Sequence, residues 1–224
     1  MATLSPSIQD YLKIIYRLAQ EGTQPTTNDV ARAMRVSAAS VTNMLKRLAE
    51  MKLVTYTSYK GVQLTESGIS IALEMLRHHR LIETYLAQAL GYSLDQLHDE
   101  AEHLEHHISE QFEDRIAELL GHPQYDPHGD PIPSKEGVVP PVFNQSLAEV
   151  AAGSHVIIRR ISDQNTELLR YLMDCQLIPQ AAFQLLAKAP FDGPLTLQKG
   201  DHQIIIGHKV AQHIFVEYQS HADP

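Results

Sequence analysis

Six of the twelve prolines in this 224-residue chain fall within residues 122–141. Before this stretch, apolar residues recur at helical spacing. After it, short apolar runs of strand length alternate with turn residues. So many prolines are typical of an extended linker, because proline cannot continue a helix or donate to a sheet. We therefore expect a mainly α protein with a small β domain: domains at 1–75 and 76–141, the second including the linker, and a third at 142–224.

The first 75 residues predict a winged helix-turn-helix. Thr26–Asn28 offers a cap for one short helix, and Ser37 caps a second helix that runs to Glu50. A two-stranded hairpin follows between Leu53 and Leu64. This order of elements favours DNA binding, although helix pairs of this kind also occur in proteins that bind no DNA.

The second of these helices has one apolar face, formed by Val41, Leu45 and Leu48. Its other face carries side chains that can bond base edges or phosphates. The predicted DNA-binding residues are Ser37, Ala39, Ser40, Asn43, Lys46 and Arg47, with Tyr59 and Lys60 at the tip of the hairpin. The alternative is that these are ordinary solvated residues on an exposed face.

The net charge of −9 is unevenly distributed. Residues 1–75 hold 8 Lys and Arg against 6 Asp and Glu, whereas residues 76–121 hold 3 against 10, with 6 of the 13 histidines. Carboxylates together with imidazoles are typical of a divalent cation site. The single cysteine excludes an internal disulfide and a Cys-rich zinc module, and it fits a reducing cytoplasm. No apolar run of membrane-spanning length or export signal is evident, so we expect a cytoplasmic protein without a membrane partner.

The acidic segment contains Glu102-x-x-Glu105-His106, with His98 one turn earlier. On a continuous helix these side chains would share one face, where a cation between the carboxylates would relieve their repulsion. His79 and Glu83 form a similar pair on the preceding helix. A solvated acidic face is the alternative. The chain has no His-Glu-x-x-His, which argues against a zinc peptidase.

Several of these motifs occur together in one known order. They are Asp10-Tyr11-Leu12, the helix 37–47, His79-Arg80 with Glu83, His98 to Glu102, Glu105-His106 and Gly129 to Pro133. With them the chain resembles the diphtheria-toxin-repressor family of metal-dependent transcriptional regulators, three-domain type. The resemblance implies an SH3-like barrel as the third domain.

The resemblance also implies two metal sites. The primary site would consist of Asp10, Glu102, Glu105 and His106. The second would consist of His79, Glu83 and His98, with Gln164 and Glu167 contributed by the SH3-like domain. Iron-type members have sulfur ligands where this chain has Asp10 and Glu102, so its hard oxygen ligands favour Mn²⁺, with Fe²⁺ as the alternative. Manganese-type members have a glutamate where this chain has Lys13, which argues against a close binuclear site.

The function implied is a homodimeric, metal-activated repressor of metal-transport genes that binds double-stranded operator DNA and is not an enzyme. A ferritin-like di-metal enzyme is one alternative, suggested by Glu100-x-x-His103. A metal-independent winged-helix ligand sensor is another. Oxygen uptake with Fe²⁺ would identify the enzyme, and DNA binding unchanged by a chelator would identify the sensor.

Overall fold

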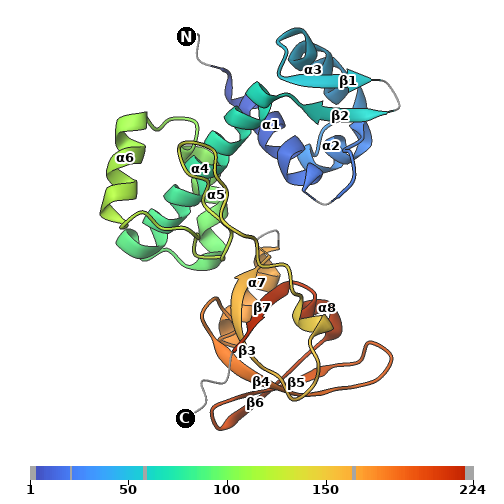
Figure 1. Cartoon of the computed structure of the whole chain (residues 1–224), viewed down its shortest axis with the longest axis vertical. Coiled ribbons are helices and arrows are strands. Elements are labelled where there is room, and N and C mark those ends of the chain that lie inside the picture. The colour runs from blue at the N-terminus through green and yellow to red at the C-terminus, as the bar shows by residue number, and fades with distance from the viewer. Residues whose placement is uncertain (1–3, 21, 58–59, 163–164, 220–224) are drawn as a thin grey trace. The chain divides into compact units, whose positions relative to one another are not determined.

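The structure is a computed structural model that describes residues 4–20, 22–57, 60–162 and 165–219. It divides into two compact units. Unit 1 consists of the chain up to His79 with Leu104–Glu113 and Pro133–Val139, and unit 2 consists of Arg80–His103, Asp114–Ile132 and the chain from Pro140 onward. Two helices, α4 (Glu66–Leu90) and α5 (Leu94–Leu104), continue across this division. Figure 1 labels all the elements.

The first part of unit 1 is the expected winged helix-turn-helix. Its elements in order are α1 (Pro6–Ala19), α2 (Thr27–Met34), α3 (Ala38–Glu50), β1 (Val54–Thr57) and β2 (Gly61–Leu64). Thr26 and Asp29 form a reciprocal capping box at the start of α2, and the Ser37 hydroxyl accepts from the Ser40 amide at the start of α3. The turn between α2 and α3 begins at Arg35, whose φ of 55° places it in the left-handed region. These local signals explain why the sequence predicted this region well.

Three helices follow the hairpin: α4, α5 and α6 (Glu110–Leu119). The continuous helix considered for Glu102, Glu105 and His106 is corrected, because α5 ends at Leu104 and Glu105 and His106 lie in the turn after it. Near the start of α4, Gly68 lies so close to Leu53 that a Cβ would collide with its backbone carbonyl. Within the described ranges, no helix is long and apolar enough to cross a membrane.

The proline-rich segment differs from an extended linker. Tyr125 and Pro131 form an antiparallel bridge, and Asp126 and His128 between them are buried. Gly129, at φ 91°, lies so close to the strand that follows in the chain that a Cβ would collide with the carbonyl of Arg159. The His128 carbonyl accepts from the Ile161 amide of that strand at 2.9 Å. Residues 125–131 are therefore packed against the C-terminal sheet of unit 2.

The C-terminal part of unit 2 is a five-stranded antiparallel sheet with short helical segments. Its elements are η1 (Leu147–Glu149), β3 (His155–Ile161), α7 (Thr166–Asp174), β4 (Ala182–Lys188), β5 (Leu195–Lys199), β6 (His202–Ile206), α8 (His208–Ala211) and β7 (Ile214–Tyr218). The strand order is β6-β5-β4-β3-β7. The expected short strands after the proline-rich segment are present as these five strands. The expected SH3-like β domain is present as an open sheet, since the edge strands β6 and β7 do not pair with each other within the described residues.

Candidate metal centres and DNA-binding face

Cluster A consists of Asp10 on α1 with Glu105 and His106 in the turn after α5, and all three belong to unit 1. Their candidate ligand atoms lie within 4.8 Å of one another. His106 Nε2 lies 2.8 Å from Asp10 Oδ1 and 3.5 Å from Glu105 Oε1. His106 Nδ1 lies 2.9 Å from the side-chain oxygen of Gln9, so an Nδ1–H can donate there and leave the Nε2 lone pair for a metal.

Glu105 is the most enclosed member of cluster A. Its Oε1 lies 2.5 Å from Lys13 Nζ, and its Oε2 lies 2.5 Å from His79 Nδ1. Burial alone would raise the pKa of Glu105, but the hydrogen bond and charge of His79, together with Lys13, hold it below its usual value. The carboxylate is therefore ionised and available as a ligand at neutral pH.

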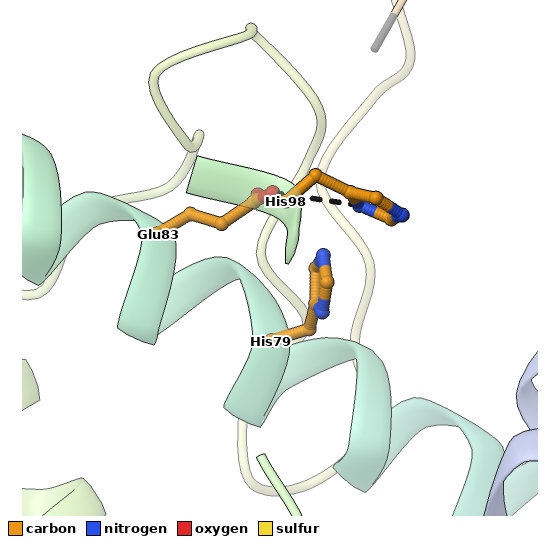
Figure 2. Close-up of side chains that lie close together, drawn as sticks. All are labelled: His79, Glu83 and His98. Carbon is orange, nitrogen blue, oxygen red and sulfur yellow. Dashed lines mark ion pairs between the residues drawn. The ribbon is translucent and has the colours of Figure 1, made fainter. Parts of the chain in front are cut away.

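A second group of predicted ligands lies along α4. Figure 2 shows the His79 and Glu83 side chains extending from this helix toward His98 of α5. Within unit 2, His98 Nδ1 is 3.9 Å from Glu83 Oε1. His79 lies one turn before Glu83 on α4.

The remaining predicted ligands differ in their placement. Glu102, on α5, lies 3.8 Å from His98 Nε2 within unit 2. Glu167 is exposed in the first turn of α7 and belongs to none of the ligand groups found among the described residues. Gln164 lies outside the residues that the structure describes.

Cluster B consists of Glu83, Asp126 and His128, all buried and all in unit 2. Its candidate ligand atoms also lie within 4.8 Å of one another, and His128 Nδ1 is 3.8 Å from Glu83 Oε2. His128 Nε2 lies 3.1 Å from the carbonyl oxygen of Leu94, so an Nε2–H can donate there and leave Nδ1 as the metal-facing nitrogen. Cluster B shares Glu83 with the group in Figure 2.

Asp126 is fixed by the loop that carries it. Its Oδ1 accepts from the backbone amides of His128 at 2.8 Å and Asp130 at 3.0 Å. Burial raises the pKa of Asp126 well above its usual value, and the nearby charges of Asp130 and Glu83 raise it further, against the opposing effect of Arg80. A divalent cation here would offset this crowding of negative charge.

Asp126 and His128 were not predicted as ligands from the sequence. Both fall in the proline-rich segment that was interpreted as a linker. Neither belongs to a pair of candidate ligands at the helical spacing that identified the other predicted ligands. One signal was present: Asp126-Pro-His128-Gly-Asp130 holds two carboxylates and an imidazole within five residues. Glu83, by contrast, was predicted as a ligand, but with other partners.

The face of α3 opposite the core is exposed. Val41, Leu45 and Leu48 are fully buried, whereas the side chains predicted to contact DNA are all exposed: Ser37, Ala39, Ser40, Asn43, Lys46, Arg47 and, in the hairpin, Lys60. Tyr59 lies outside the described residues. Two exposed cations that were not predicted, Arg35 and Lys52, flank α3 in the chain and add positive charge at its two ends.

Three family matches together span most of the chain. Residues 3–62 match the family described as iron dependent repressor, N-terminal DNA binding domain. Residues 65–134 match the iron dependent repressor metal binding and dimerisation domain, and residues 145–218 match the FeoA domain.

Full-length relatives agree with these matches. The iron-dependent repressor IdeR of Mycobacterium tuberculosis is 29% identical over 229 residues, covering 97% of this chain and 99% of that protein. The regulator MntR of Geobacillus kaustophilus is 34% identical over 122 residues, covering 54% of this chain and 86% of that protein.

Solved structures show the same fold. A manganese-dependent transcriptional repressor in complex with manganese is 38% identical, with a TM-score of 0.85, and the match covers 95% of this chain and 100% of that one. The manganese regulator SloR is 33% identical, with a TM-score of 0.77, and the match covers 96% of this chain and 100% of that one. The expected family is thereby confirmed: this chain belongs to the iron-dependent repressor family, that of the diphtheria toxin repressor, and is a metal-dependent transcriptional repressor.

Proposed function

We propose that this protein is a manganese-activated, homodimeric repressor of metal-transport genes that acts in the cytoplasm, does no catalysis and uses Mn²⁺ as co-repressor. The observation that carries the proposal is the makeup of clusters A and B. They combine carboxylates with imidazoles, and no group of candidate ligands among the described residues includes a cysteine. Oxygen and imidazole donors suit Mn²⁺, and they exclude the thiolate that softer metals prefer.

The position of cluster A supports the proposal that a metal bound there controls the helix-turn-helix. Asp10 belongs to α1, which precedes the helix-turn-helix, whereas Glu105 and His106 follow α5. Asp10, Glu105 and His106 would hold one ion, and Glu102 is proposed as its further ligand. A bound ion would supply positive charge that offsets the repulsion between these carboxylates. In a dimer, fixing α1 in this way would favour two recognition helices about 34 Å apart, the spacing of one DNA turn.

Cluster B supports a second metal that acts on unit 2. Glu83 comes from α4, whereas Asp126 and His128 come from the loop whose His128 carbonyl accepts a hydrogen bond from the Ile161 amide of β3. An ion held by these three residues would fix the packing of α4 against that loop. Gln164 and Glu167 stay predictions as donors to the neighbouring group of His79, Glu83 and His98, and the domains 1–75, 76–141 and 142–224 stay the proposed functional division.

The choice of Mn²⁺ over Fe²⁺ rests on ligand chemistry and on relatives of both kinds. The solved repressor in complex with manganese and SloR are named for manganese, whereas IdeR is named for iron. Because affinity at a given site rises from Mn²⁺ to Fe²⁺, activation by Fe²⁺ in vitro would not by itself identify the physiological metal.

The test is fluorescence anisotropy with a duplex from the promoter of a metal-transport gene in the protein's own genome, titrated with Mn²⁺, Fe²⁺, Zn²⁺ and a chelator. Wild-type protein is compared with Asp10→Asn and with Asp99→Asn, a matched control on the exposed side of α5. We expect Mn²⁺ to tighten binding for the wild type and the control but not for Asp10→Asn. Equal binding in chelator and in metal would contradict the proposal and favour a metal-independent sensor.

A further inference from the structure

Lys13 is a buried charge that contacts cluster A at Glu105. It lies one helical turn after Asp10 on α1, and its side chain is 2% exposed. Its Nζ is 2.5 Å from Oε1 of Glu105, whose side chain is fully buried. Removing an ammonium from water is costly unless a partner charge compensates, so this pair is a fixed part of the core and not a surface ion pair.

The ammonium of Lys13 pairs with Oε1 of Glu105. That Oε1 also lies 3.5 Å from His106 Nε2, which in turn lies 2.8 Å from Asp10. The other oxygen of Glu105 lies 2.5 Å from His79 Nδ1. A metal coordinated by Asp10, His106 and Oε1 of Glu105 would therefore share that oxygen with the ammonium of Lys13.

The charges limit how many ions this cluster can hold. Asp10, Glu105 and the proposed further ligand Glu102 contribute three negative charges, and Lys13 contributes one positive charge. One divalent ion therefore neutralises these four side chains. A second ion, about 3.5–4 Å from the first as in two-metal sites, would add two more positive charges and compete for the place of the ammonium.

Building on the proposed function, we propose that Lys13 is a tethered cation that takes the place of a second metal ion in cluster A. It limits this cluster to a single ion and lowers the affinity for that ion. The residue thereby sets the metal concentration at which the cluster fills. This differs from the proposal that Mn²⁺ activates the protein, which would hold with one ion or with two.

The experiment counts Mn²⁺ ions in the full-length protein by equilibrium dialysis and records the electron paramagnetic resonance spectrum of bound Mn²⁺. It uses an Asp126→Asn background, which removes a ligand of cluster B, so that the ions of cluster A dominate the count. Lys13→Met removes the charge and keeps an unbranched apolar stem. Lys13→Glu replaces the cation with a further carboxylate. Arg17→Met, which removes a cation one turn later on α1, is the matched control.

We expect the background protein and the Arg17→Met control to bind one Mn²⁺ in cluster A, without spin coupling between ions. Lys13→Met should bind that ion at least about tenfold more tightly, because a positive charge close to the metal has been removed. Lys13→Glu should bind one additional ion and show an exchange-coupled spectrum. Circular dichroism is recorded for each variant, and Lys13→Gln, which keeps a donor for Glu105, replaces any variant that does not fold.

Two results would overturn this inference: a spin-coupled manganese pair while Lys13 is in place, or unchanged affinity and ion count in every folded Lys13 variant. Failure of the proposed function looks different, because the wild-type protein would then bind no Mn²⁺ or would bind operator equally well in chelator. The two failures are therefore separable.

Discussion

Asp10 Oδ1 lies 2.8 Å from His106 Nε2, although the two residues are far apart in the sequence. The contact joins α1 to the turn that follows α5, within unit 1. The same imidazole is oriented through its other nitrogen by Gln9, one residue before Asp10. One cation could therefore be held by ligands from two segments that are distant in the sequence, Asp10 on α1 and His106 after α5. The proposed switch depends on this arrangement.

The first prediction concerns the buried pair at cluster A. Glu105→Gln should destabilise the metal-free protein by about 3 kcal/mol, because it removes the carboxylate charge that contacts the buried Lys13 ammonium. The double variant Lys13→Met with Glu105→Gln should recover much of this loss. Urea denaturation in chelator measures all four proteins of the cycle. A double variant whose destabilisation equals the sum of the two single effects would show that the pair is not coupled.

The second prediction concerns cluster B. Asp126→Asn should remove Mn²⁺ from this cluster, yet stabilise the metal-free protein at pH 7 by about 1–3 kcal/mol, because it removes a buried charge near Glu83 and Asp130. The amide oxygen can still accept from the His128 and Asp130 backbones. Thermal melts with and without Mn²⁺ measure both effects, and Asp174→Asn, an exposed carboxylate in the same unit, serves as control. A variant that still gains stability from Mn²⁺ as the wild type does would argue against Asp126 as a ligand.

The third prediction uses Glu113, which bonds Arg77 and His78 of α4. Burial acts to raise its pKa, but these two partners outweigh it and lower the pKa from 4.5 to about 2. Because the folded-state pKa is depressed, the contribution of Glu113 to stability is complete above pH 4.5 and is lost as the pH falls toward 2.

Glu113→Gln should therefore cost about 1–3 kcal/mol at pH 7 and little near pH 2. Urea denaturation at several pH values measures the difference between the variant and the wild type. Glu118→Gln, an exposed carboxylate on the same helix, is the control. A difference that stays constant with pH would show that packing, not the charge of Glu113, determines its contribution.

The fourth prediction separates two residues on the exposed face of α3. Asn43→Ala should relax preference at one or two base pairs, at about 1–3 kcal/mol, because an amide can read a base edge. Arg47→Ala, one turn further along, should weaken specific and scrambled duplexes alike and reduce the salt slope by about one, as expected of a phosphate contact. Salt titrations on both duplexes distinguish the roles, and the reverse pattern would mean that they are exchanged.

The local elements could be predicted from the sequence because their signals are local. Ser37 before an apolar period of 3.6 defines α3, and Val41, Leu45 and Leu48 identify its buried face. Glu105 and His106 were predicted as ligands through their motif. Their geometry was not, because α5 ends at Leu104 and a turn, not a helix face, presents them.

The parts that were missed depend on contacts between distant segments. His128 is buried because residues 125–131 pack between α4 and β3 within unit 2, and nothing in its neighbours reveals this. Lys13 appeared as a departure from the manganese-type pattern, but only the structure shows that its ammonium meets Glu105. The sequence likewise could not predict which strands form the edges of the C-terminal sheet. Apolar runs identify each strand, but the strand order depends on how the strands pair.

The central claim is that metal and operator binding are thermodynamically linked, and linkage is reciprocal. The most direct measurement takes the operator dissociation constant with and without saturating Mn²⁺, and the Mn²⁺ dissociation constant with and without saturating operator. The account predicts that both ratios agree and lie between about 5 and 150, the usual range of coupling between two sites. Ratios of one in both directions, with Mn²⁺ still bound, would contradict it, because the metal would then play no part in DNA recognition.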